Sequence, residues 1–177
     1  MSECYKNSLI LVGMPGAGKS TIGLLLAKHL AKDFVDTDLL IQLRAGKTLD
    51  DILREQGYLK LRALEEEVLL ATDYPNHVIA TGGSAVYSDK GMQHLKQFGP
   101  VVFLDVTQAE LEQRIHNMET RGIAKHPSQS FSDLFLERRD LYMRYADVII
   151  DGNHKTLDQL ADEIIYWEAE NYAAMDA

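Results

Sequence analysis

The stretch Gly13-Met14-Pro15-Gly16-Ala17-Gly18-Lys19-Ser20 decides the fold of this 177-residue chain. It has the pattern Gly-x-x-x-x-Gly-Lys-Ser, and it stands between a short apolar run (residues 8–12) and a segment with helical spacing (residues 19–31). A phosphate-binding loop needs this strand–loop–helix context. Glycines let successive backbone N–H groups point inward, and the helix N-terminus adds positive potential. The sequence therefore predicts a nucleotide-binding loop.

The loop also predicts separate roles for its last residues. Lys19 is expected to reach the β- and γ-phosphates, and Ser20 to offer its hydroxyl to Mg²⁺. The residues expected to contact the nucleotide are Gly13, Gly16, Ala17, Gly18, Lys19, Ser20 and Thr21. A glycine-rich strand–helix turn without a ligand is the competing interpretation, and the complete motif in this context disfavours it.

The bulk composition sets limits on the kind of protein. With 18 basic against 27 acidic residues the net charge is −9, which argues against non-specific nucleic-acid binding. No apolar run approaches the length of a membrane span, and the first seven residues are polar and lack a signal-peptide pattern. A single cysteine cannot form an internal disulfide. We expect one domain over residues 1–177, located in the cytoplasm.

Apolar runs alternate with helical patterns along the chain, which indicates βαβ units and a parallel sheet. Strands are predicted over residues 8–12, 34–36, 77–80, 101–105 and 147–150. Helices are predicted over residues 19–31, 38–44, 49–56, 59–72, 108–118, 131–145 and 156–170. A polar stretch over residues 119–130 has no such pattern and is expected to form a lid-like loop.

The remaining motifs narrow the class of nucleotide-binding protein. The chain has no Asn-Lys-x-Asp and no Asp-x-x-Gly after a strand, which a GTPase of this fold needs. A motor ATPase is usually longer and carries an apolar run that ends in acidic residues, whereas residues 101–105 end in a single Asp. The short length and the lid-like stretch favour a small-molecule kinase.

Two carboxylates follow the second predicted strand, in Val35-Asp36-Thr37-Asp38. Residues two apart on an extended segment face the same way, so both side chains are expected at the strand ends beside the loop, where open α/β sheets bind ligands. One can hold Mg²⁺ through water, and the other can accept the proton of a substrate hydroxyl. The alternative is that Asp38 is the N-cap of the next helix.

These residues together resemble the shikimate kinase family, over roughly residues 9–163. Its ordered motifs match the phosphate loop, Asp36-Thr37-Asp38, Arg62-Ala63-Leu64-Glu65, Thr81-Gly82-Gly83-Ser84-Ala85-Val86, Arg121 and Arg138-Arg139-Asp140-Leu141-Tyr142. The resemblance implies a three-layer α/β/α fold around a five-stranded parallel sheet of order 2-3-1-4-5. It also implies substrate-binding helices at about 37–73 and a lid at about 118–130.

The resemblance implies ATP and Mg²⁺ as cofactors, a monomer, and phosphorylation of the 3-hydroxyl of shikimate. Asp36 would position Mg²⁺ through water, together with Ser20, and Asp38 would bind the substrate hydroxyls and act as base. The substrate carboxylate would be bound by Arg62 and Arg138, and backbone N–H groups would come from Gly82 and Gly83. Arg121 would close over the transferring phosphate, and Arg114 would lie against adenine.

The sequence also allows each of these arginines to be a surface residue without a role in binding. Arg62 and Glu65 stand three apart, so they can form a surface pair on a helix. Arg138, Arg121 and Arg114 can each be solvated side chains.

The chain departs from the family most in the lid. Arg121-Gly122-Ile123-Ala124 stands where Arg-Pro-Leu-Leu is usual, and Ser84 replaces a third glycine. Leu61 replaces a Phe, and Tyr58 replaces an acidic residue. The alternatives to shikimate phosphorylation are a related kinase acting on another small molecule, such as gluconate or a nucleoside monophosphate, and a nucleotide-binding protein without catalysis.

Overall fold

The chain alternates strands and helices in its computed structural model, which describes residues 7–116 and 121–172. The strands are β1 (Leu9–Val12), β2 (Asp33–Asp36), β3 (His77–Ala80), β4 (Val101–Asp105) and β5 (Val148–Asp151). The helices are α1 (Lys19–Leu30), α2 (Thr37–Ala45), α3 (Leu49–Gln56), α4 (Tyr58–Leu70), α5 (Asp89–Leu95), α6 (Gln108–Arg114), α7 (Phe131–Tyr145) and α8 (Leu157–Tyr172), with a 3₁₀ turn, η1 (Ala85–Tyr87).

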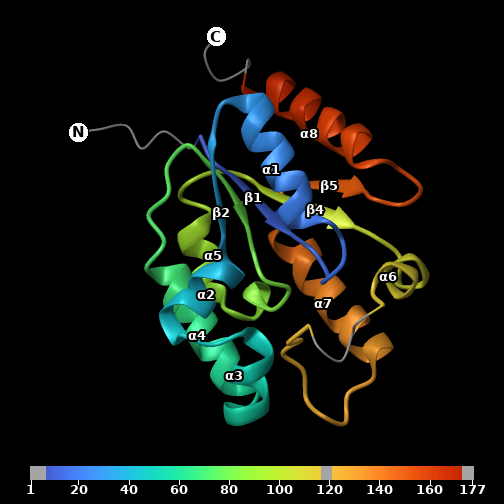
Figure 1. The fold of residues 1–177 in the computed structure, drawn as a ribbon. Helices are drawn as coiled ribbons and strands as arrows, with labels where there is room; N and C mark the ends of the chain where they lie inside the picture. Colours follow the sequence, from blue (N-terminus) through green and yellow to red (C-terminus); the bar gives the residue numbers. More distant parts are fainter. Residues whose placement is uncertain (1–6, 117–120, 173–177) are drawn as a thin grey trace.

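The strands form one parallel sheet of order β2-β3-β1-β4-β5, as predicted. β1 lies at the centre, where Leu11 pairs with Ala80 on one side and Val102 on the other. Helices α1 and α8 pack together over one face, and α7 lies against the other (Figure 1). The sheet is therefore the middle layer of an α/β/α sandwich.

The apolar runs become strands because both sheet faces are covered. Every residue of β1 is fully buried, and so are Val101 and Val102 of β4. Strands buried on both sides read as continuous apolar runs rather than as alternating patterns. All carboxyl ends of the strands lie at one edge, so the segments that follow β1, β2 and β3 meet there.

A second, smaller core lies beneath that edge. It joins α2, α3 and α4 through Ile41, Ile52, Leu61 and Val68, and it includes Ala124 from the lid-like segment. These helices stand apart from the sheet in Figure 1. The lid-like segment thus packs against the helices predicted to bind substrate.

The structure differs from the sequence-based expectation in two helical regions. The sequence patterns did not predict η1 or α5, although Ser88 caps α5 by accepting from Gly91 N. The helix predicted to run to about residue 118 ends at Arg114, because Ile115 has non-helical dihedrals (φ −94°, ψ 91°). Residues 117–120, including the start of the predicted lid, lie outside the described residues. Within the described ranges, no helix has the length and apolarity to cross a membrane.

Candidate functional site

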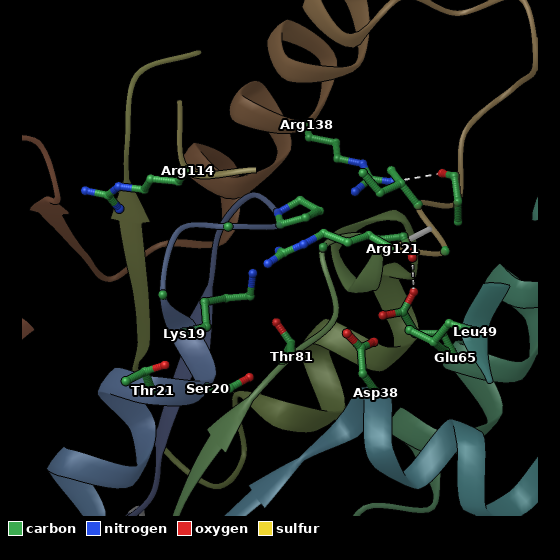
Figure 2. Close-up of a pocket in the computed structure, with 18 of the residues that line it drawn as sticks. Lys19, Ser20, Thr21, Asp38, Leu49, Glu65, Thr81, Arg114, Arg121 and Arg138 are labelled. Atoms are coloured by element: carbon green, nitrogen blue, oxygen red, sulfur yellow. Dashed lines mark hydrogen bonds between the residues drawn. The ribbon is translucent and has the colours of Figure 1, made fainter. Parts of the chain in front are cut away.

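A cavity of about 640 Å³ opens at the carboxyl edge of the sheet. Of the residues singled out by sequence, ten line it: Gly16, Gly18, Lys19, Ser20, Thr21, Asp38, Gly83, Arg114, Arg121 and Arg138 (Figure 2). Five of them do not line it: Gly13, Ala17, Asp36, Arg62 and Gly82. The cavity is the place where the phosphate loop, the acidic pair and the arginines come together.

The phosphate loop has the backbone that its glycines predict. Gly18 is the N-cap of α1 with φ 98°, and Gly16 has φ 86°. Side chains rarely adopt this left-handed region, so both positions favour glycine. Gly16 is further restricted because a Cβ there would lie 2.7 Å from Ile115 Cγ1. The loop therefore presents backbone rather than side chains to the cavity.

Lys19 lies folded into this loop. Its ammonium donates to Gly13 O at 2.7 Å and to Met14 O at 2.9 Å, and the residue is 8% exposed. Burial lowers the pKa of Lys19 to about 8, although Asp38 and Asp36 oppose the shift. A buried cation poised beside acidic groups and backbone donors suits the binding of an anion, whose negative charge would restore its full protonation.

Ser20 and Asp36 form a pair beside the loop. The Ser20 hydroxyl donates to Asp36 Oδ2 at 2.5 Å, and Asp36 Oδ1 accepts from Asp38 N at 2.9 Å. Asp36 is thus the N-cap of α2, so the alternative that gave this role to Asp38 is wrong. Hard oxygen donors such as these fit Mg²⁺, which takes one or two protein oxygens and completes its shell with water and phosphate. No group of three or more His, Cys, Asp or Glu side chains able to hold a metal occurs in the described part of the chain.

Asp38 is directed into the cavity from the first turn of α2 (Figure 2). Burial, and then the neighbouring Asp36, raises the pKa of Asp38 to about 6, while Lys19 and Arg138 oppose the shift. The carboxylate is therefore ionised at neutral pH, yet it is a far better proton acceptor than an ordinary aspartate. A general base needs this combination.

Glu65 is a site residue that sequence reasoning missed. It lines the cavity at 3% exposure, its Oε2 accepts from the Ser84 hydroxyl, and its Oε1 is buried without a hydrogen-bond partner in the described structure. Burial, and then Asp38, raises the pKa of Glu65 to about 7. The surface-pair alternative for Arg62 and Glu65 is therefore wrong. The sequence did contain a signal for the burial of Glu65, because Leu61, Glu65 and Leu69 share one helix face, with an apolar leucine on either side of Glu65.

Arg138 and Arg62 approach one another from α7 and α4. Arg138 is 1% exposed, so it is not a solvated helix residue. Its Nη2 donates to Ala124 O at 2.8 Å, and Arg62 Nη2 reaches the same oxygen at 3.3 Å. Arg62 lines an adjoining cavity of about 330 Å³, which shares Glu65 and Ser84 with the main one. The two guanidinium groups thus converge on the carbonyl oxygen of Ala124. Arg138 also lies near the phosphate loop, since a Cβ on Gly83 would lie 2.7 Å from Arg138 Nη1 and 2.9 Å from Pro15 Cδ.

The lid-like segment brings Arg121 over the phosphate loop. In Figure 2 its side chain extends toward Lys19, and its Nη1 lies 3.8 Å from the position of a Cβ on Gly16. Gly122 explains the change of lid sequence, because it has φ 63° and a Cβ there would lie 2.7 Å from Leu49 Cβ. The lid here rests closely on α3, and proline is not compatible with this backbone.

Arg114 lines the nucleotide end of the cavity at the last position of α6. Its guanidinium forms an ion pair with Glu110 and donates to Gly152 O at 3.1 Å. The side chain is therefore held by two neighbours at the cavity wall. Its contact with adenine stays a prediction.

Gly82 separates the two buried carboxylates, and a Cβ on it would collide with Asp38 Oδ1 and Glu65 Oε1. We expect Gly82→Ala to raise KM for the phosphoryl acceptor by about 10- to 100-fold. This is the effect expected when an acceptor loses one or two hydrogen bonds to the protein. KM for ATP should stay within twofold. Initial rates with each substrate varied in turn measure both constants, and an unchanged acceptor KM would show that the acceptor does not approach Gly82.

Known proteins are similar to this chain over most of its length. The family model described as "Shikimate kinase" matches residues 15–168. The chain is 35% identical over 159 residues to a shikimate kinase of Sulfurihydrogenibium sp. (strain YO3AOP1), covering 89% of this chain and 95% of the relative. It is 36% identical over 160 residues to a shikimate kinase of Clostridium botulinum (strain Eklund 17B / Type B), covering 90% and 95%.

A solved structure of the shikimate kinase of Acinetobacter baumannii in complex with shikimate superposes with a TM-score of 0.84. It is 32% identical, and the match covers 93% of this chain and 94% of that one. The match of fold, the extent of the family model and the level of identity lead to one assignment: this chain belongs to the shikimate kinase family.

Proposed function

We propose that this protein transfers the γ-phosphoryl group of ATP to the 3-hydroxyl of shikimate. One observation carries the proposal. Asp38, the phosphate loop and Arg138 line one cavity, so a base, a phosphate site and a guanidinium able to bind a carboxylate face the same space. An acceptor that carries both a hydroxyl and a carboxylate fits this set. The relative solved with shikimate supports that choice of acceptor.

The reaction follows from the positions of these side chains. Arg138 and Arg62 would hold the acceptor carboxylate, since planar guanidinium forks bind carboxylates well. Asp38 would then accept the proton of the hydroxyl as its oxygen bonds to the γ-phosphorus and the bond to ADP breaks. Lys19 and Arg121 would balance the charge on the transferring group. Most of the rate enhancement would come from this positioning and charge.

Mg²⁺ would be held by the Ser20 hydroxyl and, through water, by Asp36. When bound, it neutralises charge on the phosphates. The two residues fit this role because their oxygens already lie together at the start of α1, next to Lys19 in the chain. Removal of divalent cation by EDTA should therefore stop turnover.

We further propose that the protein acts as a cytoplasmic monomer without nucleic-acid or membrane partners, in keeping with its net charge of −9. Residues 37–73 would bind the acceptor, and residues 118–130 would form the lid. The lid would exclude water and so limit hydrolysis of ATP.

A related hydroxylated acid is the second candidate for the acceptor. It is favoured by the wall of the pocket, where the Ser84 hydroxyl stands in place of a third glycine and is bonded to Glu65. This change places a side chain where the family usually has none. A smaller or differently substituted acid would be the expected consequence.

The test is a coupled assay of ADP release with purified protein, Mg·ATP and a panel of hydroxylated acids, including shikimate and gluconate. We expect shikimate to give the highest kcat/KM. If another acid gave a higher kcat/KM, that acid and not shikimate would be the acceptor. ATP binding without turnover of any member would favour the non-catalytic alternative.

A further inference from the structure

Tyr87 lies beside the two arginines predicted to bind the substrate carboxylate. It is the last residue of η1, which directly follows the Gly82-Gly83-Ser84 segment. The Arg62 guanidinium carbon lies 3.6 Å from the centroid of the Tyr87 ring, and that of Arg138 lies 5.5 Å from it. None of the motifs shared with the family includes this tyrosine.

The two guanidinium groups carry like charges and share the nearby Glu65 carboxylate, whose pKa they lower against the effect of burial. Both donate to the carbonyl oxygen of Ala124, which brings them close together. The Nε atoms of Arg62 and Arg138 are buried and have no hydrogen-bond partner among the described residues. Hydrogen bonds therefore leave part of each cation uncompensated. The face of an aromatic ring attracts cations, so it can stabilise the part of each positive charge that hydrogen bonds leave uncompensated.

The Tyr87 ring is itself held in place from the other side. Its hydroxyl donates to Glu137 on α7, one residue before Arg138. Burial raises the pKa of the Tyr87 hydroxyl, so it remains a protonated donor at neutral pH. The ring is thus fixed between η1 and α7, and its position determines where a stacked guanidinium can lie.

We propose that Tyr87 is a positioning residue whose ring holds Arg62 and Arg138 as a preformed receptor for the carboxylate of the phosphoryl acceptor. The inference rests on the proposed function and adds to it a specificity-determining residue. A receptor that is organised in advance binds more tightly, because the side chains lose less freedom when the ligand arrives. Loss of the ring should therefore appear in KM for the acceptor and leave kcat nearly unchanged.

A purely structural role is the alternative, in which the hydroxyl of Tyr87 only ties η1 to α7. Two substitutions separate these roles. Tyr87→Phe keeps the ring and removes the bond to Glu137, whereas Tyr87→Leu removes both at similar volume. If the ring positions the arginines, Tyr87→Phe should raise KM for the acceptor far less than Tyr87→Leu, because it loses only the hydroxyl that helps to hold the ring.

The experiment measures initial rates with shikimate and ATP varied in turn. We expect Tyr87→Leu to raise KM for shikimate about tenfold, the size of effect that a desolvated cation–π contact can have. KM for ATP and kcat should stay within about twofold. The matched control is Tyr166→Leu, the same change at a tyrosine of α8 that is 66% exposed. It should leave every constant unchanged.

A second measurement tests recognition of the carboxylate itself. The carboxamide analogue of shikimate has the same hydroxyls and no negative charge. The ratio of kcat/KM for shikimate to that for the analogue should fall in Tyr87→Leu and stay constant in Tyr166→Leu. A general collapse of the pocket would instead lower both values together.

Several outcomes would overturn the inference. An unchanged KM for shikimate in Tyr87→Leu would remove the ring from recognition, and an equal rise in Tyr87→Phe would leave only the structural role. Should Tyr87→Leu not fold, Tyr87→Met carries the same test. A wild-type protein that turns over no carboxylate would overturn the proposed function and this inference with it, whereas normal wild-type turnover with insensitive variants would remove this inference alone.

Discussion

Replacement of Lys19 by methionine is expected to lower kcat/KM for phosphoryl transfer at least about a thousandfold, the upper range for the loss of one preorganised donor. The side chain is 8% exposed, and its ammonium lies between two loop carbonyls, within reach of any phosphate that the loop binds. Methionine has a similar length and fills the same space without the charge. The measurement is ADP release at saturating acceptor, with ATP varied.

The control is Lys28→Met, which makes the same change at an exposed position of the same helix. It should leave kcat/KM and the melting temperature unchanged. If Lys19→Met kept more than about a tenth of wild-type activity while folded, the loop would not be the site of phosphoryl transfer.

Proton uptake gives an independent check of the Lys19 assignment. The pKa of Lys19 is about 8 because the side chain is buried, so above pH 8 most unliganded molecules have a neutral amine there. Bound phosphates favour the charged form, so binding of ATP should take up a proton. Calorimetry at pH 8.5 in buffers of different ionisation enthalpy measures this uptake, and Lys19→Met should reduce it.

The parts of the site that could be predicted from sequence are those formed by residues close together in the chain. The phosphate loop is a contiguous stretch, and Asp36 and Asp38 follow a strand whose end the fold places beside it. In a parallel sheet the carboxyl ends of strands meet at one edge, so the order of strands and motifs fixes which groups are neighbours. The sheet order is confirmed, Asp36 lies beside the loop through its contact with Ser20, and Asp38 lines the same cavity as the loop.

The parts that could not be predicted depend on which face of a helix is buried and on contacts between distant elements. Glu65 looked like the partner of Arg62 three residues away, but the helix turns it inward to Ser84. Tyr87 has no local pattern, and its importance comes from arginines on α4 and α7. Arg62 lies behind Glu65 in the adjoining cavity rather than in the main one. Such relations exist only after the chain has folded.

Asp38→Asn is expected to lower kcat by about 10²- to 10⁴-fold, the range for removal of a general base. Asparagine keeps the size and hydrogen-bonding oxygen of the side chain and cannot accept the proton. Binding of ATP should be nearly unchanged, because Asp38 lies toward the acceptor and Lys19 holds the phosphates. Single-turnover rates together with ATP titration separate the two effects.

The same substitution should stabilise the unliganded protein at high pH. The folded-state pKa of Asp38 is about 6, above the ordinary value of 3.8, so the folded state binds this proton more tightly than the unfolded state does. The stability that Asp38 contributes is therefore fully present below about pH 4 and is lost as the pH rises through 6. Asparagine avoids this loss, so Asp38→Asn should melt a few degrees above wild type at pH 8 and show little difference at pH 4.

The opposite signs of these two effects are what a functional carboxylate predicts. Replacing a side chain that stabilises the fold makes the protein less stable. A base held in a buried acidic pair instead destabilises the fold, and the chemistry of the site requires that cost. Asp73→Asn, at an exposed loop position, is the matched control and should change neither activity nor melting temperature. A mutant at position 38 that is as fast as wild type, or one that melts lower at pH 8, would show that Asp38 supports the fold and that the acceptor is activated by another group.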